Sequence, residues 1–291
     1  MRDEVRLRPM TADDVAVAEQ ISDEAFHAVD LATARVGDPA PQRRAPERSQ
    51  RWAARTRRLV EVDPGGCWVA EDDSGVLGFA TSMVREQLWL LATYALRPEA
   101  QGRGIGRMLL DRVEEYGARC PRAMLSASED PKALRRYHAA GFALHPQLVF
   151  RGRPDRSEIP AGLGVREATD DDLGWMDDLD RRLRGGPHGP DHVALAAMAS
   201  PLALRDRSGY AYAGPDATYV VAAQTPDGAR RLLWEALARA GESFEIPHVT
   251  TANSWAVDVA MAARLAMSTR GYLAVRGMAP PAPYVHNGSL L

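Results

Sequence analysis

Residues 101–106 carry the strongest chemical pattern of the chain, a Gln followed by three glycines at alternate positions. Glycine lets the backbone turn tightly because it has no Cβ. The turn lies between an apolar stretch and a helical pattern, so the unpaired N–H groups of the first helical turn point outward, where the helix dipole favours an anion. Arg103 and Arg107 add positive charge beside it. The residues therefore predict a cradle for a diphosphate.

The spacing of these glycines distinguishes the turn from two other phosphate-binding loops. A dinucleotide-binding fingerprint requires G-x-G-x-x-G inside a βαβ unit and an acidic residue about 20 positions later. A Walker loop requires G-K-[ST]. Here the order is G-x-G-x-G, and the loop follows several strands.

The elements that must position the turn form an α/β pattern with a mixed sheet. Alternating and apolar stretches predict strands, and a 3.6-residue period predicts helices. A turn signal at residues 72–75 predicts a hairpin between the second and third strands. The expected strands are 5–9, 67–70, 76–84, 88–96, 123–126 and 142–150, and the expected helices are 15–26, 49–60, 105–116 and 131–140.

A weak internal repeat indicates two domains of one kind. Residues 8–15 match residues 166–173, with an Arg, a Thr and two Asp at the same spacing. One repeat of this length predicts a tandem of two similar domains. We expect a first domain over residues 1–152, a linker over 153–163, and a second domain over 164–291.

Two motifs of the first half resemble the GNAT superfamily of N-acetyltransferases. Gln-x-x-Gly-x-Gly after Leu-x-x-Pro-Glu looks like the acetyl-CoA signature, and residues 130–142 resemble the second motif, A-x-x-x-Y-x-x-x-G-F. The resemblance covers residues 4–150 and implies two GNAT-like acyl-CoA N-acyltransferase domains in tandem. It implies acetyl-CoA as co-substrate, with no metal, and a primary amine of a small molecule or peptide as acceptor, by direct transfer in a ternary complex.

The resemblance also assigns roles to residues. Tyr137 is the expected acid that protonates the departing thiolate, and a phenol suits this task in a dry site. Asp130 stands where the family often has Asn, and it cannot donate a hydrogen bond when ionised. Backbone groups would pair with the pantetheine arm and N–H groups would hold the diphosphate; the implied binding residues are Tyr94, Ala95, Leu96, Gln101, Gly102, Arg103, Gly104, Ile105, Gly106, Arg107, Asp130 and Tyr137.

The sequence does not identify the base that would remove a proton from the acceptor amine. Glu86 is the first candidate, because it immediately precedes the strand expected at the centre of the sheet. His145, Glu24, His27 and the terminal carboxylate at Leu291 remain alternatives.

The second half reads as a degenerate copy. Thr225 and Asp227 stand where the first copy has Gly102 and Gly104, and Ala260 stands where the acid tyrosine would be. A carboxylate would repel a diphosphate, so we expect no acetyl-CoA there. Two histidines within residues 184–192 show no third metal ligand in the sequence, and the glycines and prolines around them indicate a turn.

Composition excludes several other classes. A net charge of -3 gives no reason to expect a nucleic-acid or membrane partner, and the arginines at 43–44 and 55–58 are expected on solvated helix faces. Two cysteines in no metal-ligand spacing, and a charged start without an apolar core, indicate a cytoplasmic protein. We expect a monomer or homodimer. Alternatives are a mycothiol-synthase-like tandem, in which the intact copy would be the other one, and a non-catalytic acetyl-CoA-binding sensor.

Overall fold

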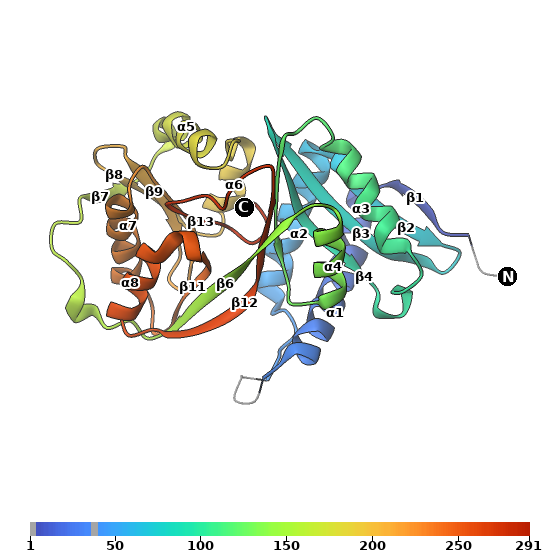
Figure 1. The fold of residues 1–291 in the computed structure, drawn as a ribbon, viewed down its shortest axis with the longest axis horizontal. Helices are drawn as coiled ribbons and strands as arrows, with labels where there is room; N and C mark the ends of the chain where they lie inside the picture. Colours follow the sequence, from blue (N-terminus) through green and yellow to red (C-terminus); the bar gives the residue numbers. More distant parts are fainter. Residues whose placement is uncertain (1–3, 36–39) are drawn as a thin grey trace.

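The computed structural model describes residues 4–35 and 40–291 as two lobes side by side, each built from half of the chain (Figure 1). An eight-stranded and a five-stranded sheet form their frames. The predicted mixed α/β architecture is confirmed, because antiparallel and parallel strand pairs occur in one sheet. None of the helices within these residues has the length and apolar character to cross a membrane.

The first lobe is an antiparallel meander followed by one parallel strand. Its strands are β1 (Arg6–Pro9), β2 (Cys67–Asp72), β3 (Gly75–Arg85), β4 (Leu88–Leu96) and β5 (Arg122–Ala127). Its helices are α1 (Val15–Thr33), α2 (Pro46–Val62), α3 (Ile105–Tyr116) and α4 (Pro131–Ala139). The first two helices pack on one face of the sheet and α3 packs on the other, so β3 and β4 are buried on both sides.

Two helices of this lobe are longer than the sequence pattern predicted. α1 continues past the expected end at residue 26 to Thr33. α2 begins at Pro46, three residues early, because proline fits the first turn of a helix, where its missing N–H has no partner to lose.

The second lobe repeats this plan. Its strands are β7 (Val165–Glu167), β8 (Ser200–Leu204), β9 (Gly209–Ala213), β10 (Thr218–Ala223) and β13 (Tyr284–Val285). Its helices are α5 (Leu173–Leu183), α6 (His192–Ala196), α7 (Pro226–Ala238) and α8 (Ser254–Ala262). The strand order is β13-β10-β9-β8-β7.

Three further strands join the lobes, and they are β6 (Ala143–Gly152), β11 (Phe244–Thr250) and β12 (Ala266–Arg276). The large sheet ends in the order β5-β12-β6-β11. The partners of β6 are therefore both strands of the second half, and the partners of β12 are both strands of the first half. Figure 1 shows β6 and β12 crossing the middle of the molecule together.

The repeated motif before α1 and α5 forms the same structure twice. Arg8 donates two hydrogen bonds of 2.7 Å to Asp14, which also accepts from the Thr11 amide. Arg166 and Asp172 pair at 2.6 and 2.7 Å in the second copy. These charge-assisted bonds lower the pKa of Asp14 to about 2. The weak sequence match therefore reflects a real structural repeat.

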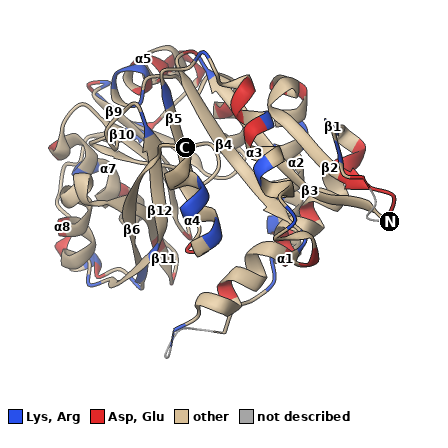
Figure 2. Cartoon of the chain, turned by 45° about the vertical axis from the view of Figure 1, so that its right-hand side comes forward, with Lys and Arg blue, Asp and Glu red and all other residues tan. Residues whose placement is uncertain are grey.

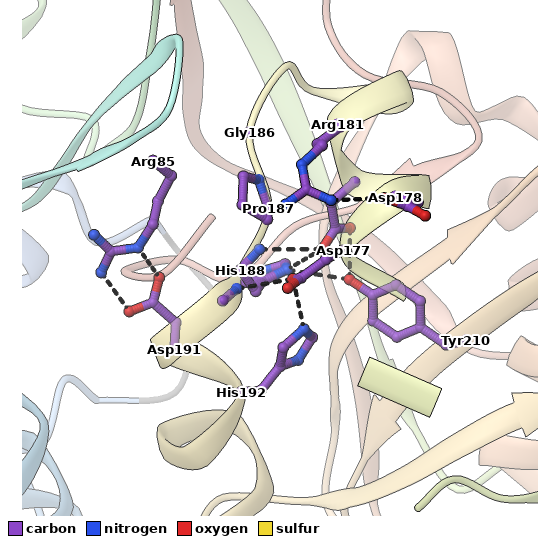
Figure 3. Close-up of polar contacts among 12 residues, drawn as sticks. Arg85, Asp177, Asp178, Arg181, Gly186, Pro187, His188, Asp191, His192 and Tyr210 are labelled. Atoms are coloured by element: carbon purple, nitrogen blue, oxygen red, sulfur yellow. Dashed lines mark hydrogen bonds and ion pairs between the residues drawn. The ribbon is translucent and has the colours of Figure 1, made fainter. Parts of the chain in front are cut away.

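A buried ion cluster fixes the second lobe against β3. Arg85 donates to Asp191 through Nε and Nη2, at 2.7 Å each (Figure 3), and it also donates to Asp63 at 2.9 Å. The ion pairs and bonds to both carboxylates keep the pKa of Arg85 above its usual value against the opposing effect of burial. Removing one partner would leave buried charge unpaired, so this contact holds the lobes in one arrangement.

Candidate active site

The gap between β4 and β5 opens a cavity of about 1390 Å³. The parallel pairing of these strands ends at Leu91 and Leu125, and β4 has an extra residue, Ala92, opposite β3 at that point. Such a bulge bends a strand away from its neighbour. From Ala92 to Leu96 the edge of β4 that faces away from β3 has no strand partner among the described residues. An extended ligand can add to this edge as a strand would.

The glycine turn, predicted from the sequence to bind a diphosphate, lies in the wall of the cavity. Gly102 and Gly104 have φ of 78° and 84°, and a Cβ at either would meet nothing within 4 Å. Within the described chain, the N–H groups of residues 102–106 donate to no protein group. Five amide donors therefore converge near the start of α3. The Arg107 amide, also expected to be free, instead donates to the Gly104 carbonyl at 3.0 Å and belongs to the helix.

The positive charge at the cradle comes from α4 rather than from the turn itself. Arg103 pairs with Asp72 at 3.5 Å, and Arg107 pairs with Asp111 on the exposed side of α3, so each of these side chains already has an acidic partner. Lys132 donates to the Gln101 amide oxygen at 3.2 Å, and Arg136 donates to the Tyr94 hydroxyl. Figure 2 shows that Lys and Arg colour much of α4.

Asp130 has a local role that answers the doubt about its side chain. It is the N-cap of α4 and accepts from the Lys132 amide at 2.9 Å. A cap needs only an acceptor, so an ionised carboxylate serves here as well as the amide of Asn.

Tyr137 lies on α4 in the wall of the cavity, 5% exposed. Its ring packs edge-on against Phe142, and its hydroxyl makes no hydrogen bond to any residue that the structure describes. Burial raises the pKa of the phenol well above its usual value. The group therefore remains protonated at neutral pH and keeps one O–H to donate into the cavity.

Glu86, the first candidate for the base, is separated from the cavity. It occupies the turn between β3 and β4 with φ of 56°, and its carboxylate accepts from Arg181 at 2.9 Å. The cavity is lined by the opposite end of β4, so the sequence argument chose the wrong end of this strand.

Of the other candidates for the base, some line the cavity and others do not. Glu24 pairs with Arg97 at 3.5 Å, and neither it nor His145 lines the cavity. Leu291 is buried, where its carbonyl oxygen accepts from Arg184 and Tyr284, and it is also absent from the cavity wall. His27 does line the cavity.

A histidine that the sequence argument missed, His248 on β11, faces the cavity from the second lobe. The carbonyl oxygen of Asn287 lies 3.0 Å from Nδ1 of His286, so that nitrogen carries the proton. Nε2 of His286 then accepts from the Gln147 amide at 2.8 Å, and Gln147 Oε1 accepts from Nδ1 of His248 at 3.0 Å. This chain of bonds leaves Nε2 of His248 as the unprotonated nitrogen.

The surroundings of His248 keep its ring neutral and its free nitrogen open. Burial, and the charge of Arg270, lower the pKa of His248 to about 4. Its φ of 60° is strained for a residue with a Cβ, which is typical of functional positions. A Cβ at Gly288 would lie 2.9 Å from Nε2, so glycine there leaves this nitrogen accessible.

The equivalent gap of the second lobe is filled by the chain itself. β13 pairs with the edge of β10 at Val221 and Ala222, the edge that corresponds to the open edge of β4. Asn253 holds this segment, accepting from the Tyr284 amide at 2.8 Å and donating to the Pro281 carbonyl at 3.1 Å.

The second glycine-turn position offers fewer amide donors than the first. Thr225 caps α7 through its own hydroxyl, which accepts from the Gly228 amide at 3.2 Å, and Pro226 has no N–H. The second lobe therefore has neither an open strand edge nor a cradle of amides.

The two histidines of residues 184–192 are internal to the second lobe. His188 binds Asp180 at 2.7 Å, and His192 binds Asp177 at 3.1 Å (Figure 3). Asp177, Asp180 and His192 each offer one atom within 4.8 Å of the others, a group that contains only one of the two histidines. Each of these groups already has a hydrogen-bond partner in the protein.

Comparison with known proteins matches part of the chain to one family. Residues 29–142 match the model of the acetyltransferase (GNAT) family. Mycothiol acetyltransferase of Streptomyces avermitilis is 39% identical over 97 residues, which are 31% of this chain and 31% of that protein. The chain thus matches about a third of the length of this curated relative.

Solved structures share the fold over nearly the whole chain. A putative acetyltransferase from Pyrococcus horikoshii has a TM-score of 0.74 at 17% identity and covers 98% of this chain and 95% of that one. A tandem GNAT protein from the clavulanic acid biosynthesis pathway has a TM-score of 0.57 at 13% identity, with 95% and 99% covered. Two GNAT-like units in tandem are therefore the fold of this chain.

Proposed function

Residues 29–142 belong to the GNAT acetyltransferase family, and from that premise we propose that the protein is an N-acetyltransferase. It moves an acetyl group from acetyl-CoA to a primary amine of a small molecule or peptide, by direct transfer in a ternary complex. One observation carries the proposal: an open strand edge, the glycines of a turn with free amides and a protonated tyrosine line one cavity. Its volume of about 1390 Å³ exceeds the usual ~300–1,000 Å³ of a single-ligand pocket, so two substrates can meet there.

The residues of the first lobe fit acetyl-CoA as a substrate. The amides of residues 102–106 donate to its diphosphate, and Lys132 and Arg136 add charge. Residues 94–96 on the open edge of β4 pair with the pantetheine arm. Bound there, acetyl-CoA supplies an acetyl group activated as a thioester. Acetyl selection over longer acyl groups follows from the family alone.

Tyr137 and His248 hold the two protons of the reaction in this proposal. Tyr137 donates its proton toward the thiolate that departs, because burial keeps the phenol protonated. His248 replaces Glu86 as the base, since its Nε2 is unprotonated and its ring is neutral at pH 7. The acid then belongs to the first half of the chain and the base to the second.

We propose a matching division of the chain. Residues 1–152 form the catalytic domain, 153–163 the linker, and 164–291 a degenerate copy that binds no acetyl-CoA. The degenerate copy completes the large sheet and supplies His248 to the cavity. Its own gap is filled by β13, which takes the place that a pantetheine arm would occupy.

Calorimetric titration with acetyl-CoA tests the proposal, with Gly104→Asp and Gly162→Asp as a matched pair. Both glycines have positive φ and open space for a Cβ, so backbone strain is similar, but Gly162 lies in the linker. We expect one site per chain, lost in Gly104→Asp and kept in Gly162→Asp. Two sites would refute the degenerate copy, and no binding to the native protein would refute the transferase.

A further inference from the structure

Arg55 on α2 lines the cavity and makes no hydrogen bond or ion pair with the part of the chain that the structure describes. Its Nε is fully buried and makes no hydrogen bond, and neither Nη atom has a hydrogen bond or ion pair with the residues that the structure describes. The sequence placed residues 55–58 on a solvated face, and this is wrong for Arg55 and for Arg58, which donates to the Pro190 carbonyl. Arg55 is half-buried as a residue, but a buried Nε–H of a cation without an acceptor is costly, so it points to a group that arrives with a ligand.

The charges around Arg55 also favour an anionic ligand. Burial and the charge of Arg44 lower the pKa of Arg55 to about 10, so it remains a cation at neutral pH. Arg44 is itself satisfied, because it donates to Glu19 at 2.7 Å and to Ser22 at 2.9 Å. Ten Arg and Lys side chains and six carboxylates line the cavity within the described residues. The unmatched charge is therefore positive, and it includes the buried, unpartnered Nε of Arg55.

A second orphan atom and an aromatic wall lie in the same region. Nδ1 of His27, on α1, is buried in the cavity wall without a hydrogen-bond partner in the described chain. The guanidinium groups of Arg44 and Arg55 lie 5.5 and 5.9 Å from the ring of Trp52. α1 and α2 cover the face of the sheet opposite α3, so this region lies across the sheet from the cradle.

We propose that Arg55 binds an oxyanion of the acceptor, a carboxylate or a phosphate, so that the protein acetylates amines that carry an anionic group. The inference rests on the proposed function, because it places the acceptor on the α1–α2 side of the cavity. A guanidinium holds either anion through two parallel N–H bonds, which orients the ligand as well as attracting it. His27 adds a second polar contact to the same ligand.

The stability of the free protein distinguishes a binding arginine from a structural one. Arg55→Met keeps the apolar contacts of the side chain and removes the unpaired charge, so we expect its Tm to rise by about 2–4 °C. Arg57→Met, an exposed neighbour on the same helix, is the control and should leave Tm unchanged. A fall in Tm on Arg55→Met would overturn the inference.

Anion binding is measured without acetyl-CoA, so that it does not depend on the transferase activity. In the Gly104→Asp background, which blocks the cradle, inorganic phosphate and acetate are titrated separately by thermal shift. At least one of the two anions should raise Tm, and Arg55→Met should lower the affinity for that anion at least tenfold. The anion that binds identifies the anionic group of the acceptor. If neither anion depends on Arg55, the inference is wrong even where acetyl-CoA binds normally.

Acetylation of paired amines then measures selectivity. The pairs are β-alanine with β-alaninamide, and phosphoethanolamine with ethanolamine. We expect kcat/KM at least tenfold higher for the anionic member of one pair, with the preference abolished by Arg55→Met. Equal rates within both pairs would overturn the inference and leave the transferase intact, whereas failure of acetyl-CoA to bind would refute the transferase alone.

Discussion

At the scale of single residues, removing the hydroxyl oxygen of Tyr137 separates its expected role in catalysis from any role in binding acetyl-CoA. Tyr137→Phe keeps the ring packed against Phe142 and removes the proton donor, so we expect kcat to fall about 10²-fold or more while the Kd for acetyl-CoA changes less than twofold. Rapid mixing and calorimetry measure the two quantities. Tyr116→Phe, on the far side of α3 beside Asp63, is the control. Unchanged cellular function in Tyr137→Phe would instead support the acetyl-CoA sensor.

The assignment of His248 as the base and the assignment of Glu86 predict opposite effects of substitution. His248→Gln should lower kcat/KM by about 10²-fold, and Glu86→Gln should stay within twofold of the native protein. Because the pKa of His248 is about 4, the pH profile of the native enzyme should show no step near 6.5 from this group. A reversed ranking of the two variants in a thiol-release assay would restore Glu86 as the base.

His188 should make stability depend on pH. Burial, and then the charge of Arg184, lower its pKa from 6.5 to about 4, so between these values the unfolded state binds a proton that the folded state does not. Stability therefore falls as pH falls from 6.5 to 4, by up to about 3 kcal/mol from this residue. His188→Asn retains a donor for Asp180 and should reduce the slope of unfolding free energy against pH in this window. An unchanged slope in urea titrations would contradict the assignment.

Residue types near the cradle were predictable, whereas residues that depend on the other half of the chain were not. Gly102 and Gly104 lie in a local motif whose spacing indicated an anion cradle, and the resemblance to GNAT N-acetyltransferases implied the role of Tyr137 beside it. His248 reaches the cavity only because β6 and β11 pair across the halves, a contact between residues about 100 positions apart. Arg55 has the same local pattern as an exposed helix arginine, and only tertiary packing buries it.

At the scale of elements, the two copies of one position have acquired different functions. Asp130 caps α4 at the cavity, while its counterpart Asn253 makes four buried hydrogen bonds, two of which hold the segment of β13 in the second gap. Asn253→Ala leaves several buried groups without partners and should cost about 3 kcal/mol or more, against about 1 kcal/mol for Asp130→Ala. Urea unfolding of both variants measures the difference. Equal costs would mean that β13 does not depend on Asn253.

The bounds of a helix or strand could be predicted from the sequence where local sequence signals mark both of its ends. α3 and β4 were predicted over their full lengths because a glycine turn separates them and each has a clear apolar pattern. The ends of α1 and α2 were wrong, because proline can begin a helix as well as interrupt one. The exchange of β6 and β12 could not be predicted, since a strand pattern does not name its neighbour.

At the scale of the whole molecule, the lobes complete each other and should not fold apart. Both partners of β6 are strands of the second half, and one apolar cluster contains residues of both halves, including Phe79 and Tyr210. A fragment of residues 1–160 would expose β5 and β6 as long unpaired edges. We therefore expect residues 1–160 and residues 161–291 to be unfolded or aggregated when expressed singly.

Coexpression of the two fragments tests whether the strand exchange is the reason that neither folds alone. Together the two fragments should form one complex that unfolds cooperatively and binds acetyl-CoA once per pair, because the break lies in the linker and cuts no strand. A chain with ten Gly-Ser residues inserted after residue 160 is the control, and loop-closure entropy should cost it less than about 1 kcal/mol. Circular dichroism and calorimetry report folding and binding. A fragment of residues 1–160 that folds and binds acetyl-CoA alone would show that the exchanged strand is dispensable. If that fragment also transferred acetyl groups at the native rate, His248 could not be the base.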